Sequence, residues 1–250
     1  MLFFQRILAF RKDETPAERR AGRRYCISPR FPLRTVLNIV RRDDMGNLLA
    51  AGDGGGRDWT GRLVNISSTG ARVQVAPGAT ARSGDACRLK LDLEGHRLEL
   101  PGQVAHVTER RDSLVYGLSL DELEGECLAA YDQFIELIAL GATLKPTRPL
   151  QPHDANYLVE QYAGDPGTQL DVWRHYAGRD VAAFEFRLRE HRVRGHAGCA
   201  ELEVLPADAA PGALPPEQSA EIQRLFQWVV PNLPTSVPAD VREFLRHYAA

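Results

Sequence analysis

The chain has 250 residues, of which 44% are hydrophobic, so it is long enough to bury the core of one or two domains. Its net charge of -2 is unevenly distributed: residues 1–30 carry eight basic and three acidic side chains, a net charge of +5, and the rest of the chain carries -7. Four cysteines without CxxC spacing are typical of free thiols, and no apolar run reaches the ~18 residues of a membrane span. These features argue against a disulfide-stapled or membrane-spanning chain and predict a cytoplasmic protein.

The N-terminal segment, residues 1–17, begins with an apolar stretch over residues 1–10. This stretch is too short for a membrane span and lacks the small-residue cleavage site of a secretory signal. We expect it to pack on its own protein, and contact of residues 1–10 with a membrane surface is the less favoured alternative. The basic residues that follow are typical of an arm for an anionic partner, although a solvated tail has the same composition.

Six short runs rich in Val and Leu lie between about Thr35 and Leu120, separated by Gly, Asp and Pro. They read TVLNIV, WTGRLVNI, ARVQV, CRLKLDL, HRLELPGQVAHVT and SLVYGLSL. Because no helix separates them, they predict a small antiparallel barrel, whose closure leaves no exposed strand edge. The sequence GDGGG between the first two runs lacks the strand-to-helix setting of a phosphate-binding loop, so we expect a flexible connection.

A helix is predicted after the barrel, within residues 121–141. Apolar residues recur there at spacings of three and four and form a face that should lie on the barrel: Cys127, Tyr131, Phe134, Ile135 and Ile138. The barrel domain, with its arginine arm and this helix, is assigned to residues 18–142. A linker is expected at residues 143–152, because closely spaced prolines oppose both helix and sheet.

Residues 153–250 predict a small α+β domain with helices on one sheet face. Strands are expected at QLDVWRH, VAAFEFRL and CAELEVL, and a loop at about residues 206–217. Two helices follow, with apolar faces formed by Ile222, Leu225, Phe226 and Val229 and by Val241, Phe244, Leu245 and Tyr248. No family is identified for this domain, and we expect it to bind a protein partner whose nature is unknown.

A polar stretch interrupts the hydrophobic pattern of the second barrel strand at residues 65–70, which read NISSTG. It matches the pattern D/N-x-S-x-x-G, although the same composition is typical of an ordinary turn. Upstream, residues 20–24 match RxxxR. In this order, ahead of strands that end in YGLSL and a helix, the two motifs resemble the PilZ family of cyclic-di-GMP receptors.

The resemblance implies a cyclic-di-GMP receptor that is mainly β with α: a small antiparallel barrel plus helix, followed by the α+β domain. It implies no resident cofactor and no metal. Arginine suits this ligand, because a guanidinium binds phosphate or the O6 and N7 edge of guanine with a forked geometry and stacks on the base. Gly70 is expected to allow a positive φ or a close backbone approach at the turn. The implied ligand-binding residues are Arg19, Arg20, Arg23, Arg24, Asn65, Ser67 and Gly70.

Three registers of the arginine motif are open. Two overlap, one ending at Arg23 and one at Arg24, and we prefer the second because Tyr25 follows it, as is common in the family. The third ends at Arg30, which has Cys26 in place of the first arginine. In that register the motif is degenerate, and the alternative function is a PilZ-like protein-interaction module that does not bind the nucleotide.

Other functions have little support in the sequence. His191 and His196 are five residues apart, which does not place them as a metal pair on one helix face, and no GxSxG, HExxH or P-loop pattern occurs. We therefore expect no enzyme activity. A nucleic-acid polymer is disfavoured as a partner, because the chain outside the arm is acidic and lacks interleaved aromatic residues. The prediction is a signalling adaptor whose arm closes over the ligand and passes a conformational change to a partner.

Overall fold

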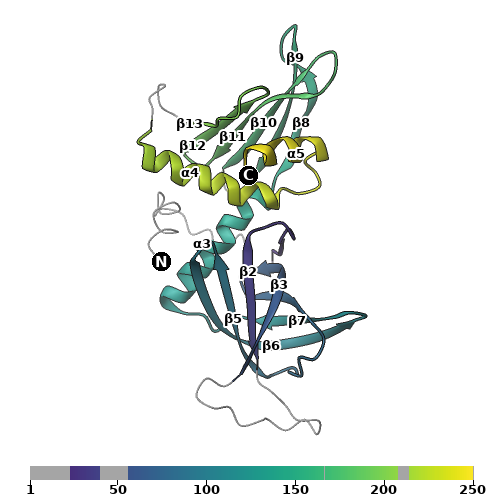
Figure 1. Ribbon diagram of the computed structural model, residues 1–250, viewed down its shortest axis with the longest axis vertical. Helices are drawn as coiled ribbons and strands as arrows, with labels where there is room; N and C mark the ends of the chain where they lie inside the picture. The colour runs from purple at the N-terminus through teal and green to yellow at the C-terminus, as the bar shows by residue number, and fades with distance from the viewer. Residues whose placement is uncertain (1–22, 40–55, 166, 208–213, 250) are drawn as a thin grey trace. The chain divides into compact units, whose positions relative to one another are not determined.

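The computed structural model describes residues 23–39, 56–165, 167–207 and 214–249 (Figure 1). The chain divides into two compact units, the first ending at Ile135 and the second beginning at Glu136. The predictions for residues 1–17, Arg19, Arg20, most of the GDGGG loop and part of the loop at 206–217 lie outside the described residues.

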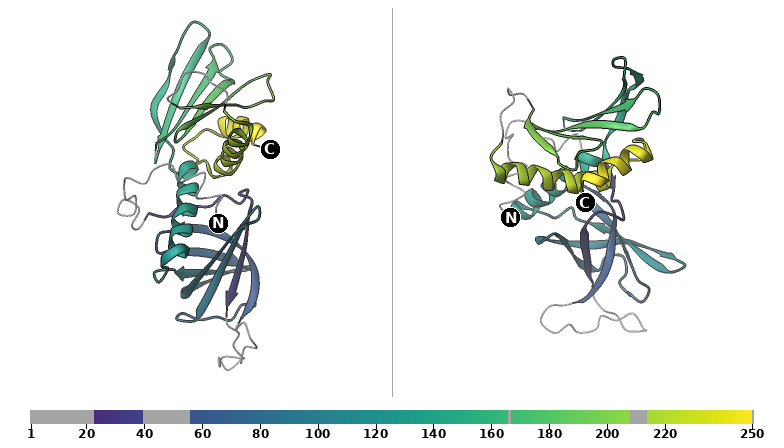
Figure 2. Two further views of the ribbon diagram at one scale, coloured as in Figure 1. Left: turned by 90° about the vertical axis from the view of Figure 1, so that its left-hand side faces the viewer. Right: turned by 45° about the horizontal axis from the view of Figure 1, so that its top comes forward.

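A closed antiparallel barrel forms the first unit (Figures 1 and 2). Its strands follow the order β3-β2-β5-β6-β7-β4, and β4 pairs with β3 to close the ring. Their bounds are β2 (Leu33–Ile39), β3 (Arg57–Ser67), β4 (Gly70–Val75), β5 (Ala86–Leu93), β6 (His96–Arg110) and β7 (Ser113–Ser119). The predicted barrel and its six strands are confirmed.

Alternation of apolar and polar residues directs one face of each barrel strand to the core. On β4, Ala71, Val73 and Val75 are buried, whereas Arg72 and Gln74 face outward and are half-buried. Successive side chains of a strand point to opposite faces, so this pattern places all three apolar groups inside. Each such burial of a valine or leucine contributes about 1.5–3 kcal/mol to the stability of the barrel.

Helix α3 (Gly125–Ala142) begins after the last barrel strand, and its residues up to Ile135 belong to the first unit. Tyr131 and Phe134 are buried, and the Phe134 ring centroid lies 6.5 Å from that of Phe31. The predicted helix is thus confirmed, and its first half packs on the barrel. The residues of α3 from Glu136 onward belong to the second unit.

A six-stranded antiparallel sheet forms the second unit, in the order β13-β12-β11-β10-β9-β8. Its strands are β8 (Lys145–Pro152), β9 (Tyr157–Gly164), β10 (Thr168–His175), β11 (Val181–Leu188), β12 (His191–His196) and β13 (Glu203–Pro206). The predicted strands at QLDVWRH and VAAFEFRL are confirmed, and CAELEVL contributes only its last part, in β13. The sequence analysis did not predict β9 or β12.

The segment predicted to be a linker is in fact an edge strand, β8. Its prolines at 146, 149 and 152 have no backbone N–H to donate, whereas an interior strand must hydrogen-bond to a neighbouring strand on each side. Only one side of β8 is paired, and its register with β9 shifts on both sides of Arg148. The prediction was wrong because closely spaced prolines oppose an interior strand but are tolerated at a sheet edge.

Helices α4 (Pro216–Val229) and α5 (Ala239–Tyr248), joined by the short 3₁₀ helix η1 (Val230–Asn232), lie on one face of this sheet (Figure 2). α4 contacts β12 and β13, and α5 contacts β11. Between these layers, the Phe184 ring stacks on Phe226 at 5.6 Å and meets Tyr248 edge-on at 5.5 Å. The predicted α+β domain and both helices are confirmed. None of the described helices combines the length and apolar character that crossing a membrane requires.

Candidate functional site

The predicted motif forms the tip of the hairpin between β3 and β4. Ser67 pairs with Gly70, and the two residues between them make the turn. The Ser67 hydroxyl donates to the Gly70 carbonyl at 3.2 Å. The Tyr131 hydroxyl donates to the Ser67 carbonyl at 2.7 Å and to the Gly70 carbonyl at 3.3 Å. Burial raises the pKa of Tyr131, so this phenol stays protonated and holds both carbonyls of the turn from α3.

Gly70 is required by the close approach of a neighbouring strand. A Cβ at this position would overlap the carbonyl oxygen of Leu118 on β7, which is backbone and has little freedom to move. The φ of Gly70 is not among the positive values that occur at other glycines of the chain. The expectation of a positive φ was therefore wrong, and the expected close backbone approach is the reason for this glycine.

A two-residue strand that the sequence did not predict, β1 (Tyr25–Cys26), places the arginine segment next to the motif. Cys26 pairs with Asn65 on β3, and Tyr25 pairs with the residue after it. Continuing this register sets Arg24 opposite Ser67. Alternation places Arg24 on the outward face, with Cys26 and Asn65. Arg24 and Cys26 are exposed, and Asn65 is half-buried.

The other arginines take different positions. The guanidinium of Arg23 lies 5.5 Å from the centre of the Tyr25 ring, so it faces the other side of β1 from Arg24. Arg30 is exposed in the turn that precedes β2, where its N–H donates to the Ser28 hydroxyl at 3.2 Å. The described part of the chain therefore brings Arg24, but not Arg30, beside the motif, and Arg19 and Arg20 lie outside it.

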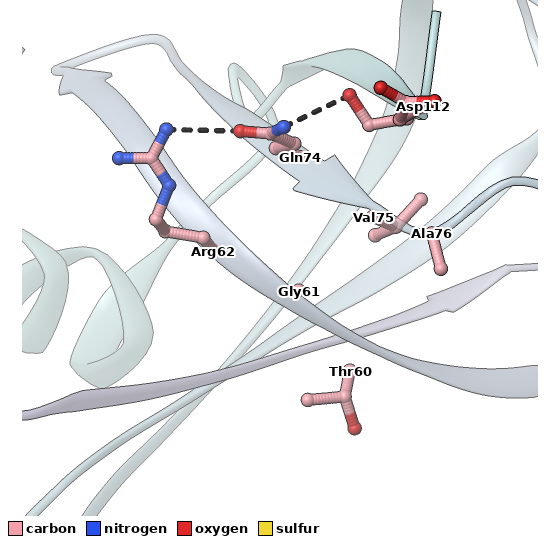
Figure 3. Close-up of a pocket in the computed structure, with 8 residues that line it drawn as sticks. Thr60, Gly61, Arg62, Gln74, Val75, Ala76 and Asp112 are labelled. Carbon is pink, nitrogen blue, oxygen red and sulfur yellow. Dashed lines mark hydrogen bonds between the residues drawn. The ribbon is translucent and has the colours of Figure 1, made fainter. Parts of the chain in front are cut away.

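An open depression of about 350 Å³ lies farther along the outer face of β3 and β4 (Figure 3). Arg62 donates to the Gln74 side chain at 3.0 Å, and Gln74 donates to the Ser113 hydroxyl at 2.9 Å, as the dashed lines in Figure 3 show. None of the predicted ligand-binding residues lines this depression. Arg62, Gln74 and Ser113 bond to one another here, and the depression is not part of the site at the motif.

The two histidines considered in the sequence analysis do not form a metal pair. They stand at the two ends of β12, and an odd spacing on a strand directs side chains to opposite faces. Burial lowers the pKa of His191, whose ring lies 3.2 Å from the Gln218 amide. Within residues 23–39, 56–165, 167–207 and 214–249, no group of three or more His, Cys, Asp or Glu side chains could hold a metal ion.

Two further residues near the motif were missed by the sequence analysis as contributors to the site. Tyr131 was assigned only to an apolar helix face, although its hydroxyl holds the motif turn. Arg72 lies directly opposite Asn65 and faces the same side of the barrel. Because alternate residues of a strand share a face, counting two residues on from Gly70 along β4 would have found Arg72. No local sequence pattern predicts the hydrogen bonds of the Tyr131 hydroxyl to the turn.

Comparison with known proteins gives three results. The family model described as PilZ domain matches residues 28–136. No curated protein matches the chain. Among solved structures, the chain is similar to the PilZ domain with c-di-GMP of YcgR from Escherichia coli, at a TM-score of 0.33 and 11% identity over 45% of this chain and 86% of that one. It is also similar to the Borreliella burgdorferi PlzA protein in complex with c-di-GMP, at a TM-score of 0.31 and 11% identity over 72% of this chain and 83% of that one.

The matched range covers the turn before β2, all six barrel strands and the part of α3 that packs on the barrel. It includes the motif at residues 65–70 and ends at the boundary between the two units. The arginine segment precedes it. By the family model and the barrel on which the motif lies, residues 28–136 of this chain are a PilZ domain.

Proposed function

We propose that the barrel domain, with its arginine arm from about residue 18, is a receptor for cyclic-di-GMP. One observation carries the proposal: the pairing of Cys26 with Asn65 sets the arginine segment alongside the polar motif, on the outward face of the barrel. An RxxxR motif elsewhere in a chain is common by chance. The position of Arg24, the last residue of the motif, one strand away from the D/N-x-S-x-x-G turn is a specific arrangement, which favours the register that ends at Arg24.

The chemistry of this arrangement suits a cyclic dinucleotide. Arg24 supplies a charged fork for phosphate or for the O6 and N7 edge of guanine. The amide of Asn65, on the same face, both donates and accepts hydrogen bonds. Gly70 lets the turn sit against the neighbouring strand. Arg19, Arg20 and Arg23 complete the proposed ligand-binding set from the arm, with Ser67 at the turn.

A change in the arm is the proposed signal. On binding, the arginine contacts hold the arm on the ligand, and the conformational freedom that the arm loses is offset by charge-assisted hydrogen bonds. We assign the domain at residues 153–250 as the part that binds a protein partner. A ligand can shift this equilibrium only through contacts that differ between the two states, and the arm supplies them.

Calorimetric titration with cyclic-di-GMP tests the receptor function directly. A second readout uses Cys26, which is exposed and lies next to Asn65. Bound ligand should slow the alkylation of Cys26 by iodoacetamide and leave Cys199, a half-buried thiol in the second unit, unchanged. Saturating cyclic-di-GMP with no heat and no protection of Cys26 would refute the proposal.

Amide hydrogen exchange tests the movement of the arm separately. Residues 17–30 should gain protection on binding, together with residues 64–70. Protection confined to residues 64–70 would leave the receptor intact and refute the clamp.

One observation favours a second candidate, a PilZ-like interaction module that does not bind the nucleotide. Ser67 is only 6% exposed, and its hydroxyl is already engaged by the Gly70 carbonyl. This contact is what an ordinary stabilised turn would show. The titration separates the two candidates. For either one, we infer a binding role without catalysis and a cytoplasmic location, the latter argued from the four free cysteines.

A further inference from the structure

Two β-bulges lie on the same level of the barrel, on either side of the β4–β7 pair. The β3–β4 register shifts between Leu63 and Asn65. The β6–β7 register shifts between Val104 and His106. A bulge adds one residue to a strand and re-aims the side chains that follow, and bulges are over-represented next to functional sites. Here they set Asn65 and His106 on the outward face.

The bulges complete a row of directly opposed residues across five strands. Cys26 pairs with Asn65, and Asn65 with Arg72. Arg72 in turn pairs with Gly117, and Gly117 with His106. Opposed residues share a face and have Cβ atoms about 4.5–5.5 Å apart. The row therefore runs from the arginine segment, past the motif residue Asn65, to Arg72 and His106 on the outer wall of the barrel.

The glycine in this row makes room for the histidine. A Cβ on Gly117 would overlap the His106 ring, with Nδ1 only 2.6 Å away. The imidazole therefore lies directly on the backbone of β7, beside Arg72. His106 is itself exposed, so the outer side of its ring is open to a ligand.

Arg72 has binding capacity that the protein leaves unused. It is half-buried, and its Nε is fully buried without a hydrogen-bond partner. No ion pair joins Arg72 to a carboxylate in the described parts of the chain. Because this Nε is covered, the terminal nitrogens of Arg72, between Asn65 and the His106 ring, are the donors that remain for an acceptor of the ligand.

We propose that a guanine base of the ligand stacks on His106 and presents its O6 and N7 edge to Arg72. The inference rests on the proposed cyclic-di-GMP function and names the residues that read the base. Histidine rings stack nucleobases, and the arginine fork matches two acceptors of guanine. Adenine places an N6 amino donor where guanine has O6, so it cannot accept both bonds from Arg72. Arg72 therefore selects guanine over adenine.

Affinities for cyclic-di-GMP and cyclic-di-AMP in matched variants test this assignment. Arg72→Gln should weaken cyclic-di-GMP binding roughly 5- to 150-fold and leave cyclic-di-AMP binding unchanged, so that the preference for guanine shrinks. His106→Ala should weaken both by a similar factor, and His106→Phe, which keeps a planar ring, should bind like the parent. Arg88→Gln is the control, because Arg88 is an exposed arginine on β5, outside the row, paired with Glu99.

The outcomes separate this inference from the function on which it rests. If the parent binds and both Arg72→Gln and His106→Ala match it, the row is refuted and the receptor function stands. Equal loss of both dinucleotides in Arg72→Gln would indicate a phosphate contact and overturn the base-reading role. A parent that binds neither dinucleotide overturns both proposals. If Arg72→Gln unfolds, Arg72→Lys replaces it in the test. Lysine keeps the positive charge but lacks the forked guanidinium, so this variant should also lose the preference for guanine.

Discussion

Removing the Tyr131 hydroxyl should loosen the motif turn without disturbing the core. Tyr131→Phe keeps the buried ring and deletes the donor that reaches the Ser67 carbonyl at 2.7 Å and the Gly70 carbonyl at 3.3 Å. The Gly70 carbonyl keeps its bond from the Ser67 hydroxyl, whereas the Ser67 carbonyl loses its side-chain donor. The Ser67 carbonyl keeps its backbone pairing with Gly70, so the loss is that of one hydrogen bond, about 0.5–1.5 kcal/mol. The opening free energy of the β3–β4 hairpin should fall by that amount.

Native-state amide hydrogen exchange measures this change locally, which matters because the chain has two units and global unfolding need not be two-state. Peptides that cover residues 63–75 should exchange roughly 2- to 13-fold faster in Tyr131→Phe. The control is Tyr25→Phe. Tyr25 is 3% exposed in the same unit, and its hydroxyl has no partner among the residues described. This control should exchange like the parent. Equal exchange in Tyr131→Phe and the parent would refute the view that α3 holds the turn.

Three further predictions concern Ser67, Cys87 and Arg174. Ser67→Ala should lower cyclic-di-GMP affinity with little loss of thermal stability, and unchanged affinity by calorimetry would favour the plain turn. Burial raises the pKa of Cys87 to about 12 from 9.0. The contribution of this thiol to the stability of the first unit should therefore be constant below about pH 9 and fall between about pH 9 and 12. Cys87→Ala should reduce the loss of stability over that range in urea titrations. Arg174→Ala should destabilise the second unit by about 3–5 kcal/mol. The change removes the guanidinium that lies 2.8 Å from Glu160 and leaves that largely buried carboxylate as an unpaired charge. If hydrogen exchange of β10 shows a fall of less than about 1 kcal/mol in its opening free energy, the prediction is contradicted.

The sequence by itself determined the elements whose signal is local. Alternation of Val and Leu with polar residues predicted all six barrel strands, and spacings of three and four predicted α3, α4 and α5. These patterns are readable because each follows from the period of one strand or helix. The motif at residues 65–70 was also local, and it led to the correct family for the barrel.

Only the tertiary structure decided how these pieces form a site. Strand β1 has two residues and exists because β3 offers a partner, so no local period announces it. The proline-rich segment at 145–152 became a strand because it lies at a sheet edge. Gly70 is explained by a carbonyl of β7, and the face of His106 by a bulge in β6. Each depends on a contact between residues far apart in the chain, and such contacts leave no periodic trace in the sequence of either partner.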